Sequence, residues 1–175
     1  MLFADDGLYL NPVYPDNARK IFNAISSNRD SLSEYVSWVN ILHTEEDMWQ
    51  CLMQMEQKKP RSYLFEILHK YSFAGLISVQ SIDHQIRQVE LGYWLLPEYQ
   101  ARGLMSKCIS ALTFYLFKHS DIEEIHIRII CNNHFSKAVA LKSGFRAVEQ
   151  PKQELDNGVE LFVLTKNDWL QYISF

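Results

Sequence analysis

Residues 90–106 read ELGYWLLPEYQARGLMS, a stretch that joins a predicted strand to the start of a predicted helix. Pro97 cannot donate a ladder hydrogen bond, so the strand is expected to end there. From Gly103 to His119, apolar residues recur at helical spacing along one face, which predicts a long helix. The loop between the two elements begins at Gln100 and has the spacing Gln-x-x-Gly-x-Met. The chain therefore places a helix N-terminus directly after a strand.

The start of this helix has the features of an anion-binding site. The first amide groups of a helix have no acceptor within the helix and point outward, and the helix dipole adds about half a positive charge there. A phosphate or pyrophosphate suits such a site. Gly103 would let the backbone approach the anion, Arg102 would add a charge and Ser106 a hydroxyl. In the alternative interpretation, Gly103 permits a tight turn and the loop binds nothing.

Hydrophobic periodicity elsewhere predicts one mixed α/β sheet with helices layered on it. Strands are predicted at residues 8–13, 62–68, 73–82, 88–96, 125–130, 146–150 and 159–165. Helices are predicted at residues 16–27, 103–119 and 135–143, with two more starting at Ser31 and near Thr44. Ser31 and Glu34 have the spacing of a capping box. Gly144 stands where a left-handed helix C-cap belongs.

Composition limits the class of protein. A chain of 175 residues with 47% hydrophobic and 22% charged residues is expected to form one globular domain, residues 1–175, and excludes a disordered chain. A net charge of −4 argues against a dedicated nucleic-acid binder. The six histidines and three scattered cysteines (Cys51, Cys108, Cys131) show no metal or disulfide spacing, which favours a reducing cytosol. Neither a signal peptide nor a membrane span is expected.

Four sequence elements, in order, resemble a known family. The loop at residues 100–105 resembles the Gln/Arg-x-x-Gly-x-Gly/Ala signature of the GNAT superfamily of acetyl-CoA-dependent N-acetyltransferases. Met105 departs from that signature, and we attribute the departure to helix packing. Residues 90–94, Glu-Leu-Gly-Tyr-Trp, are similar to the Glu-Ile-Gly-Tyr-Trp strand of the RimJ/RimL-type branch. Similar to that branch too are Asn28-Arg29-x-x-Leu32 with Trp38-Val39, and Asn133-x-x-Ser136 with Val139 and Gly144-Phe145.

The resemblance, which extends from about Leu8 to Thr165, implies a fold and a cofactor site. The expected fold is a mixed, mostly antiparallel central sheet with helices on both faces and a V-shaped splay between two parallel strands. Pantetheine of acetyl-CoA would lie in the splay, where Trp94, Leu95 and Leu96 would offer backbone groups. The amides expected to hold the pyrophosphate are those of Gln100, Ala101, Arg102, Gly103, Leu104, Met105 and Ser106. Asn133 would bind the cofactor arm, cap its own helix, or do both.

The resemblance also implies direct transfer of acetyl to an amine, with no metal and no covalent enzyme intermediate. Ser136 would donate to the departing sulfur, or else cap its helix. Glu154 matches a branch position proposed as the general base, although it also fits a solvated hairpin carboxylate. Glu90, on the strand beside the splay, is the rival base or a structural ion pair. By alternation Glu90 shares one face with Trp94, while Tyr93 lies on the other.

By branch resemblance, the acceptor is expected to be the α-amino group of a protein N-terminus, such as that of a ribosomal protein. Two alternatives remain open. The enzyme would acetylate a small amine, such as a polyamine or an aminoglycoside, or the chain would hold acyl-CoA without turnover. In each case the protein is expected in the cytoplasm as a monomer or homodimer, without membrane or direct nucleic-acid contact.

Overall fold

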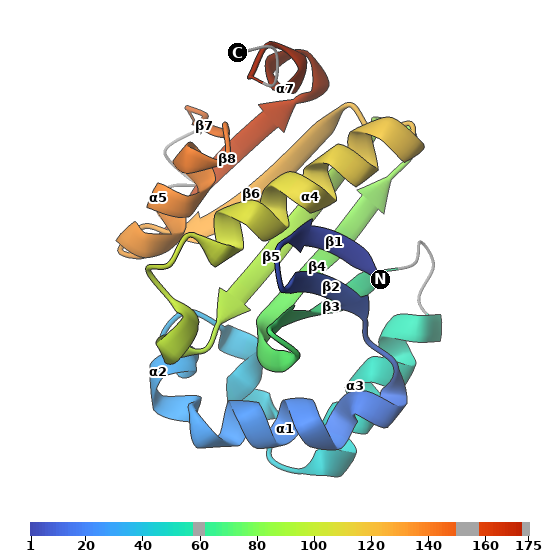
Figure 1. Cartoon of the computed structure of the whole chain (residues 1–175), viewed down its shortest axis with the longest axis vertical. Coiled ribbons are helices and arrows are strands. Elements are labelled where there is room, and N and C mark those ends of the chain that lie inside the picture. Colours follow the sequence, from blue (N-terminus) through green and yellow to red (C-terminus); the bar gives the residue numbers. More distant parts are fainter. Residues whose placement is uncertain (58–61, 150–157, 173–175) are drawn as a thin grey trace.

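The computed structural model describes residues 1–57, 62–149 and 158–172, in which runs of strands are separated by helices (Figure 1). The strands are β1 (Leu2–Asp5), β2 (Leu8–Pro12), β3 (Tyr63–His69), β4 (Ser72–Asp83), β5 (Gln88–Leu95), β6 (Glu124–Ile130), β7 (Arg146–Ala147) and β8 (Val159–Thr165). The helices are α1 (Ala18–Ser27), α2 (Arg29–Ser33), α3 (Glu45–Gln57), α4 (Leu104–His119), α5 (His134–Lys142) and α7 (Lys166–Tyr172). Short 3-10 turns are η1 (Pro15–Asn17), η2 (Ser37–Ile41) and η3 (Pro97–Tyr99).

One sheet runs through the molecule in the order β1-β2-β3-β4-β5-β6-β8-β7. Every neighbouring pair is antiparallel except β5 and β6, which are parallel. Their ladder pairs Gln88–Leu91 with Glu124–Ile127 and then stops, although β5 continues to Leu95 and β6 to Ile130. The two strands therefore separate at their carboxyl ends, which confirms the predicted splay within a mostly antiparallel sheet.

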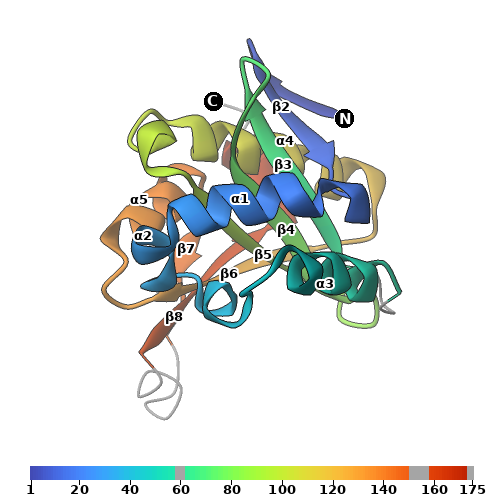
Figure 2. The same cartoon turned by 90° about the horizontal axis from the view of Figure 1, so that it is seen from below.

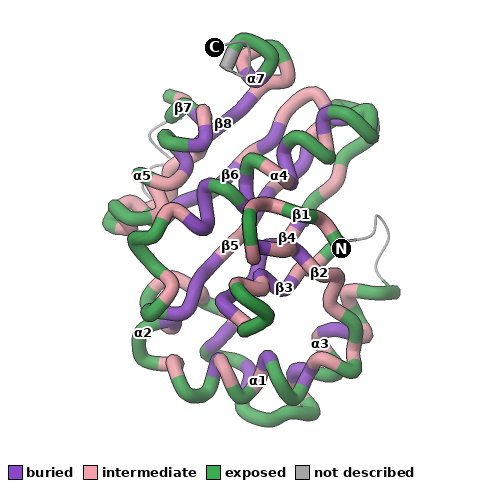
Figure 3. The backbone as a smooth tube through the Cα atoms, in the orientation of Figure 1, coloured by how far each residue is buried: buried purple, intermediate pink, exposed green. Residues whose placement is uncertain are grey.

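Each face of the sheet carries its own hydrophobic core, as the period of two along β5 requires. Leu91 and Leu95 belong to the core under α4 and α5, whereas Trp94 belongs to the core under α1, α2, η2 and α3. Figure 2 shows α1, α2 and α3 together on one side of the sheet. Figure 3 shows buried backbone concentrated in the central strands and on the inner side of α4. Helices on both faces and the predicted alternation of β5 are confirmed.

Local sequence signals placed most of these elements, with a few errors. Thr44 and Asp47 exchange the reciprocal bonds of an N-terminal cap, since each backbone amide donates to the other's side chain, at 2.8 and 3.1 Å. The prediction of a capping box at Ser31 and Glu34 was wrong. Helix α2 already begins at Arg29, and the Ser31 hydroxyl donates to the Asn28 carbonyl from inside the helix.

Two terminal elements were not predicted from the sequence, and one strand is shorter than predicted. Strand β1 has four residues and helix α7 has seven, so neither shows a sustained period. Strand β7 covers only residues 146–147 of the predicted 146–150. Residue 150, at the end of that predicted strand, lies outside the described residues. Gly144 has a φ of 87°, which confirms the left-handed cap after α5.

Gly75 allows β4 to approach the end of β5, and replacing it is expected to destabilise the sheet beside the splay. A Cβ at this position would lie 2.2 Å from the Trp94 carbonyl oxygen and 2.8 Å from the Leu95 Cα. We expect Gly75→Ala to lower the free energy of unfolding by about 2 kcal/mol, measured by urea denaturation. Gly158→Ala is the control because a Cβ there meets none of the described residues within 4 Å. An equal or smaller loss in Gly75→Ala than in the control would contradict the argument.

Candidate active site

The carboxyl-terminal half of β5 presents backbone groups that no strand pairs. The Leu96 amide donates to the Ala74 carbonyl at 2.8 Å, so it points toward β4. Successive strand residues direct their backbone groups to opposite sides, and those of Tyr93 and Leu95 therefore point toward β6. Strand β6 has left the ladder after the Leu91 pair. Amides of Tyr93 and Leu95 thus line the splay, open to a ligand that runs along the strand.

The predicted pantetheine residues differ in which of their backbone groups are available. The Leu96 amide is used by Ala74 and its carbonyl accepts from the Tyr99 amide at 2.9 Å, so Leu96 offers neither group. Trp94 has the same orientation as Leu96, two residues away, and its backbone also faces β4. The Leu95 amide has an open orientation. Tyr93, which the alternation placed on the face opposite Trp94, supplies the second open amide.

The Gln100 side chain ties the loop before α4 to β5, because its amide donates to the Leu95 carbonyl at 2.9 Å. The Gln100 backbone amide is also engaged, donating to the Pro97 carbonyl at 3.2 Å. Gln100 is therefore a structural tie between the loop and β5. Ala101 and Gly103 both adopt left-handed conformations, with φ of 56° and 73°.

The amides that follow Gln100 in this loop are available. In the part of the chain that the structure describes, the backbone amides of residues 101–106 have no hydrogen-bond acceptor, and the helical ladder begins with the amide of Lys107 donating to Gly103 at 3.3 Å. They lie at the positive end of a 16-residue helix. A diphosphate is the kind of group that such a set of donors can hold.

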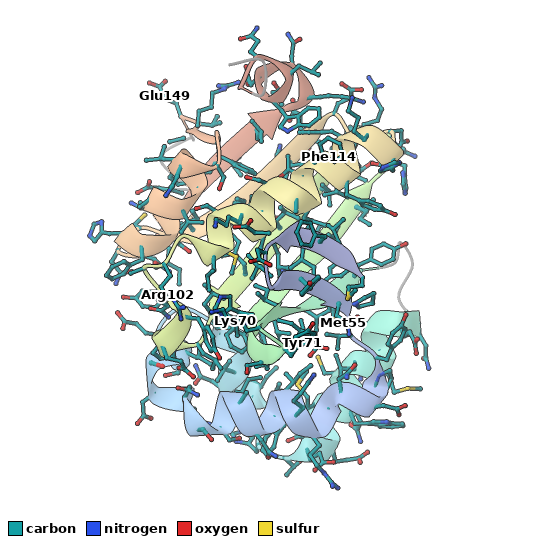
Figure 4. The ribbon with its side chains drawn as sticks, in the orientation of Figure 1. Met55, Lys70, Tyr71, Arg102, Phe114 and Glu149 are labelled. Atoms are coloured by element: carbon teal, nitrogen blue, oxygen red, sulfur yellow. The ribbon has the colours of Figure 1, made fainter. Side chains whose placement is uncertain are left out.

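Positive side chains surround the same loop. A Cβ at Gly103 would lie 3.9 Å from the Lys142 Nζ at the end of α5. Figure 4 shows Arg102 on the loop and Lys70 on the turn between β3 and β4. The Arg102 guanidinium lies 5.9 Å from the centre of the Tyr99 ring. Desolvation, followed by the charges of Arg102 and Lys70, lowers the pKa of His69. Lys142 was missed from the sequence because its approach to Gly103 depends on how α5 packs against α4.

Two residues in the first turn of α4 have roles in packing. Met105, which departs from the family signature, is 4% exposed and lies in the core under α4. Its position is therefore set by helix packing, as predicted. Ser106 is buried as well, and its carbonyl accepts from the Ser110 hydroxyl at 2.9 Å.

Across the splay, the first turn of α5 presents Asn133 and Ser136. The Asn133 side-chain oxygen accepts from the Ser136 amide at 3.0 Å, so Asn133 is the N-cap of α5. Its side-chain nitrogen has no acceptor within the described residues, nor does the Ser136 hydroxyl. The Tyr93 hydroxyl donates to the Ser136 carbonyl at 3.1 Å. The structure thus brings the predicted Asn133 and Ser136 close to the open part of β5.

The two candidate bases differ in what the structure shows. The Glu90 carboxylate, 27% exposed, accepts from the Arg128 guanidinium at 3.1 Å. This ion pair joins β5 to β6 beside the last ladder pair, and it matches the structural alternative for Glu90. Glu154 lies outside the described residues.

Among the described residues, no group of three or more His, Cys, Asp or Glu side chains is placed to hold a metal ion. Within the same residues, no helix combines the length and hydropathy that crossing a bilayer requires. The three cysteines are free thiols.

Comparisons with known proteins agree on one family. A family model for the acetyltransferase (GNAT) domain matches residues 7–146. The ribosomal-protein-serine acetyltransferase of Escherichia coli (strain K12) is 25% identical over 142 residues, covering 80% of this chain and 79% of that protein. RimL, the ribosomal L7/L12 alpha-N-protein acetyltransferase solved with coenzyme A, has a TM-score of 0.86 at 20% identity, over 94% of this chain and 97% of its own. The microcin C7 self-immunity acetyltransferase MccE, solved with acetyl-CoA and AMP, has a TM-score of 0.78 at 22% identity, over 93% of this chain and 94% of its own.

The fold and the open amides define a transferase whose acyl donor is an extended nucleotide thioester. The matched domain covers well over half of the chain, and the chain therefore belongs to the GNAT family of acetyltransferases. It is an acetyl-CoA-dependent N-acetyltransferase, and it shares its fold with RimL over nearly the whole length of both chains.

Proposed function

We propose that this enzyme acetylates the α-amino group of a protein N-terminus, with a ribosomal protein as the acceptor. The E. coli relative and RimL both act, by their names, on ribosomal proteins. The observation that supports the donor half of the proposal is the open amides, one set in the splay of β5 and a second at residues 101–106. These amides fit an extended donor with a diphosphate at one end, and they leave the thioester end beside Ser136.

We assign the cofactor contacts to groups that the fold leaves open. Amides of residues 101–106 hold the diphosphate, with Arg102 and Lys142 contributing charge. Backbone amides of Tyr93 and Leu95 bind the pantetheine arm as an added strand would. The side-chain nitrogen of Asn133 donates to the same arm while its oxygen caps α5.

Acetyl-CoA supplies an activated acetyl group. The chain must then accept a proton from the attacking amine and stabilise the charge that develops during transfer. We assign the first task to the Glu154 carboxylate, by resemblance to the RimJ/RimL-type branch. The Ser136 hydroxyl, which has no other partner among the described residues, donates a hydrogen bond to the departing sulfur. Glu90 keeps β5 joined to β6 through Arg128.

We also propose that residues 1–175 form one catalytic domain that acts in the cytoplasm. Both hydrophobic cores are built against the same sheet, so neither helical layer has a sheet of its own on which to fold alone. The free thiols suit a reducing compartment.

Binding and turnover are tested separately. Calorimetry with acetyl-CoA and with desulfo-CoA measures the cofactor site, and both are expected to bind at submillimolar concentration. Release of CoA thiol is then measured with peptides that begin with serine or alanine, with polyamines and with aminoglycosides. Thiol release with the peptides, and a matching mass increase at their N-termini, supports the proposal. CoA release with the small amines alone would mean that the acceptor is a small amine and not a protein N-terminus. Binding of acetyl-CoA without CoA release in the presence of any amine would favour a non-catalytic acyl-CoA module.

Removing the Ser136 hydroxyl is expected to slow transfer without loosening the cofactor. We expect Ser136→Ala to lower kcat at least about 10-fold, because a donor placed at a developing charge acts mainly in the transition state. The affinity for acetyl-CoA should remain within a few-fold of the wild type. Ser143→Ala, at the other end of α5, is the matched control, since its hydroxyl only donates to the Val139 carbonyl. An unchanged kcat in Ser136→Ala would withdraw Ser136 from the mechanism.

A further inference from the structure

We infer that Tyr93 is a positioning residue that holds Ser136 at a set distance from β5 across the splay. The inference rests on the role proposed for Ser136 and adds to it. Tyr93 lies two residues beyond the last pair of the β5–β6 ladder, where no strand pairing determines the separation. Its ring packs against the core under α4, and its hydroxyl donates to the Ser136 carbonyl at 3.1 Å.

This hydrogen bond has no substitute nearby. Within the described residues, no other hydrogen bond joins residues 92–95 of β5 to the end of β6 or to α5. The strands diverge at this point, so their ladder cannot determine how far α5 stands from β5. Side-chain packing alone tolerates small displacements, whereas a hydrogen bond requires a narrow range of distance and direction.

The Ser136 peptide is held from both sides, and its hydroxyl is left free. Asn133 accepts from the Ser136 amide at 3.0 Å, and Tyr93 donates to the Ser136 carbonyl. The Ser136 hydroxyl has no partner among the described residues. The Tyr93 ring therefore determines where Ser136 Oγ stands relative to the open amides of β5, along which the donor's arm lies.

Tyr93 acts as a donor over the whole working range of pH. Burial raises the pKa of its phenol to about 12, against a smaller lowering by the hydrogen bond to Ser136. The phenol therefore remains protonated at neutral pH and holds the carbonyl. A group kept protonated in this way is suited to bracing the turn rather than to accepting a proton from the acceptor amine.

The test is a double-mutant cycle on kcat with Tyr93→Phe and Ser136→Ala. Phenylalanine keeps the ring and removes the hydroxyl, so we expect kcat to fall about 5-fold through misplacement of Ser136, with the KM for acetyl-CoA within twofold. In the Ser136→Ala background, Tyr93→Phe should then change kcat by less than about 1.5-fold. Tyr115→Phe, on the outer side of α4, is the control and should leave both parameters unchanged.

Each outcome decides one question. Losses that multiply in the double variant would overturn the positioning role while leaving the acetyltransferase activity intact, and so would an unchanged kcat in Tyr93→Phe. If the wild type released no CoA with any acceptor, the proposed function itself would be contradicted. If Tyr93→Phe melts far below the wild type, 3,5-difluorotyrosine at position 93 replaces it. Because the fluorinated phenol is more acidic, the kcat of this variant should fall at a lower pH than that of the wild type. Identical pH profiles of kcat would overturn the inference.

Discussion

Gly103→Val is expected to weaken acetyl-CoA binding about 100-fold, because it displaces the amides of the loop before α4. The φ of 73° at Gly103 belongs to the left-handed region, where a β-branched residue is strained. The protein leaves room for a Cβ, whose nearest neighbour would be Lys142 Nζ at 3.9 Å. The expected loss therefore comes from the backbone conformation and from the space that a bound diphosphate needs. Calorimetric titration with CoA measures it.

Gly158→Val is the matched control for this prediction. Gly158 has a φ of 69°, and no described residue would lie within 4 Å of its Cβ, so the substitution introduces the same backbone strain away from the loop. Both variants are expected to lose about 1–2 kcal/mol of stability, and only Gly103→Val should lose CoA affinity. Similar affinities in the two variants would show that the loop amides do not hold the cofactor.

Glu154→Gln is expected to lower kcat at least about 100-fold, since a general base contributes that much or more to such a transfer. Glutamine keeps the shape of the side chain and cannot accept the proton. The acetyl-CoA affinity, measured by calorimetry, should stay within a few-fold of the wild type. Initial rates of CoA release with the best peptide acceptor give kcat.

Glu90→Gln is the comparison that decides between the two carboxylates. Glu90 is partly exposed and bound to Arg128, and ion pairs of this kind contribute about 1 kcal/mol or less to stability. We therefore expect kcat to change less than about threefold. A loss of 100-fold in Glu90→Gln, with none in Glu154→Gln, would move the general base to Glu90.

Local patterns in the chain were enough to predict most of the architecture. The period of two along residues 88–96 placed Trp94 and Leu91 on opposite faces, because burial acts on each side chain separately. The helix start near Thr44 and the left-handed Gly144 depend on bonds made within a few residues, and both were found as predicted. The loop before α4 was located for the same reason, since helix start signals are local.

The sequence patterns failed where a residue's partner lies far along the chain. Leu96 looked available for a ligand until the β4 ladder engaged its amide with Ala74. The Tyr93 hydroxyl meets Ser136, 43 residues away, only because β5 and β6 diverge and α5 returns over the gap. Lys142 reaches Gly103 only through the packing of α5. Periodicity and caps record interactions between near neighbours, whereas the pairing of distant backbone groups depends on strand order and register, which are settled when the whole sheet forms.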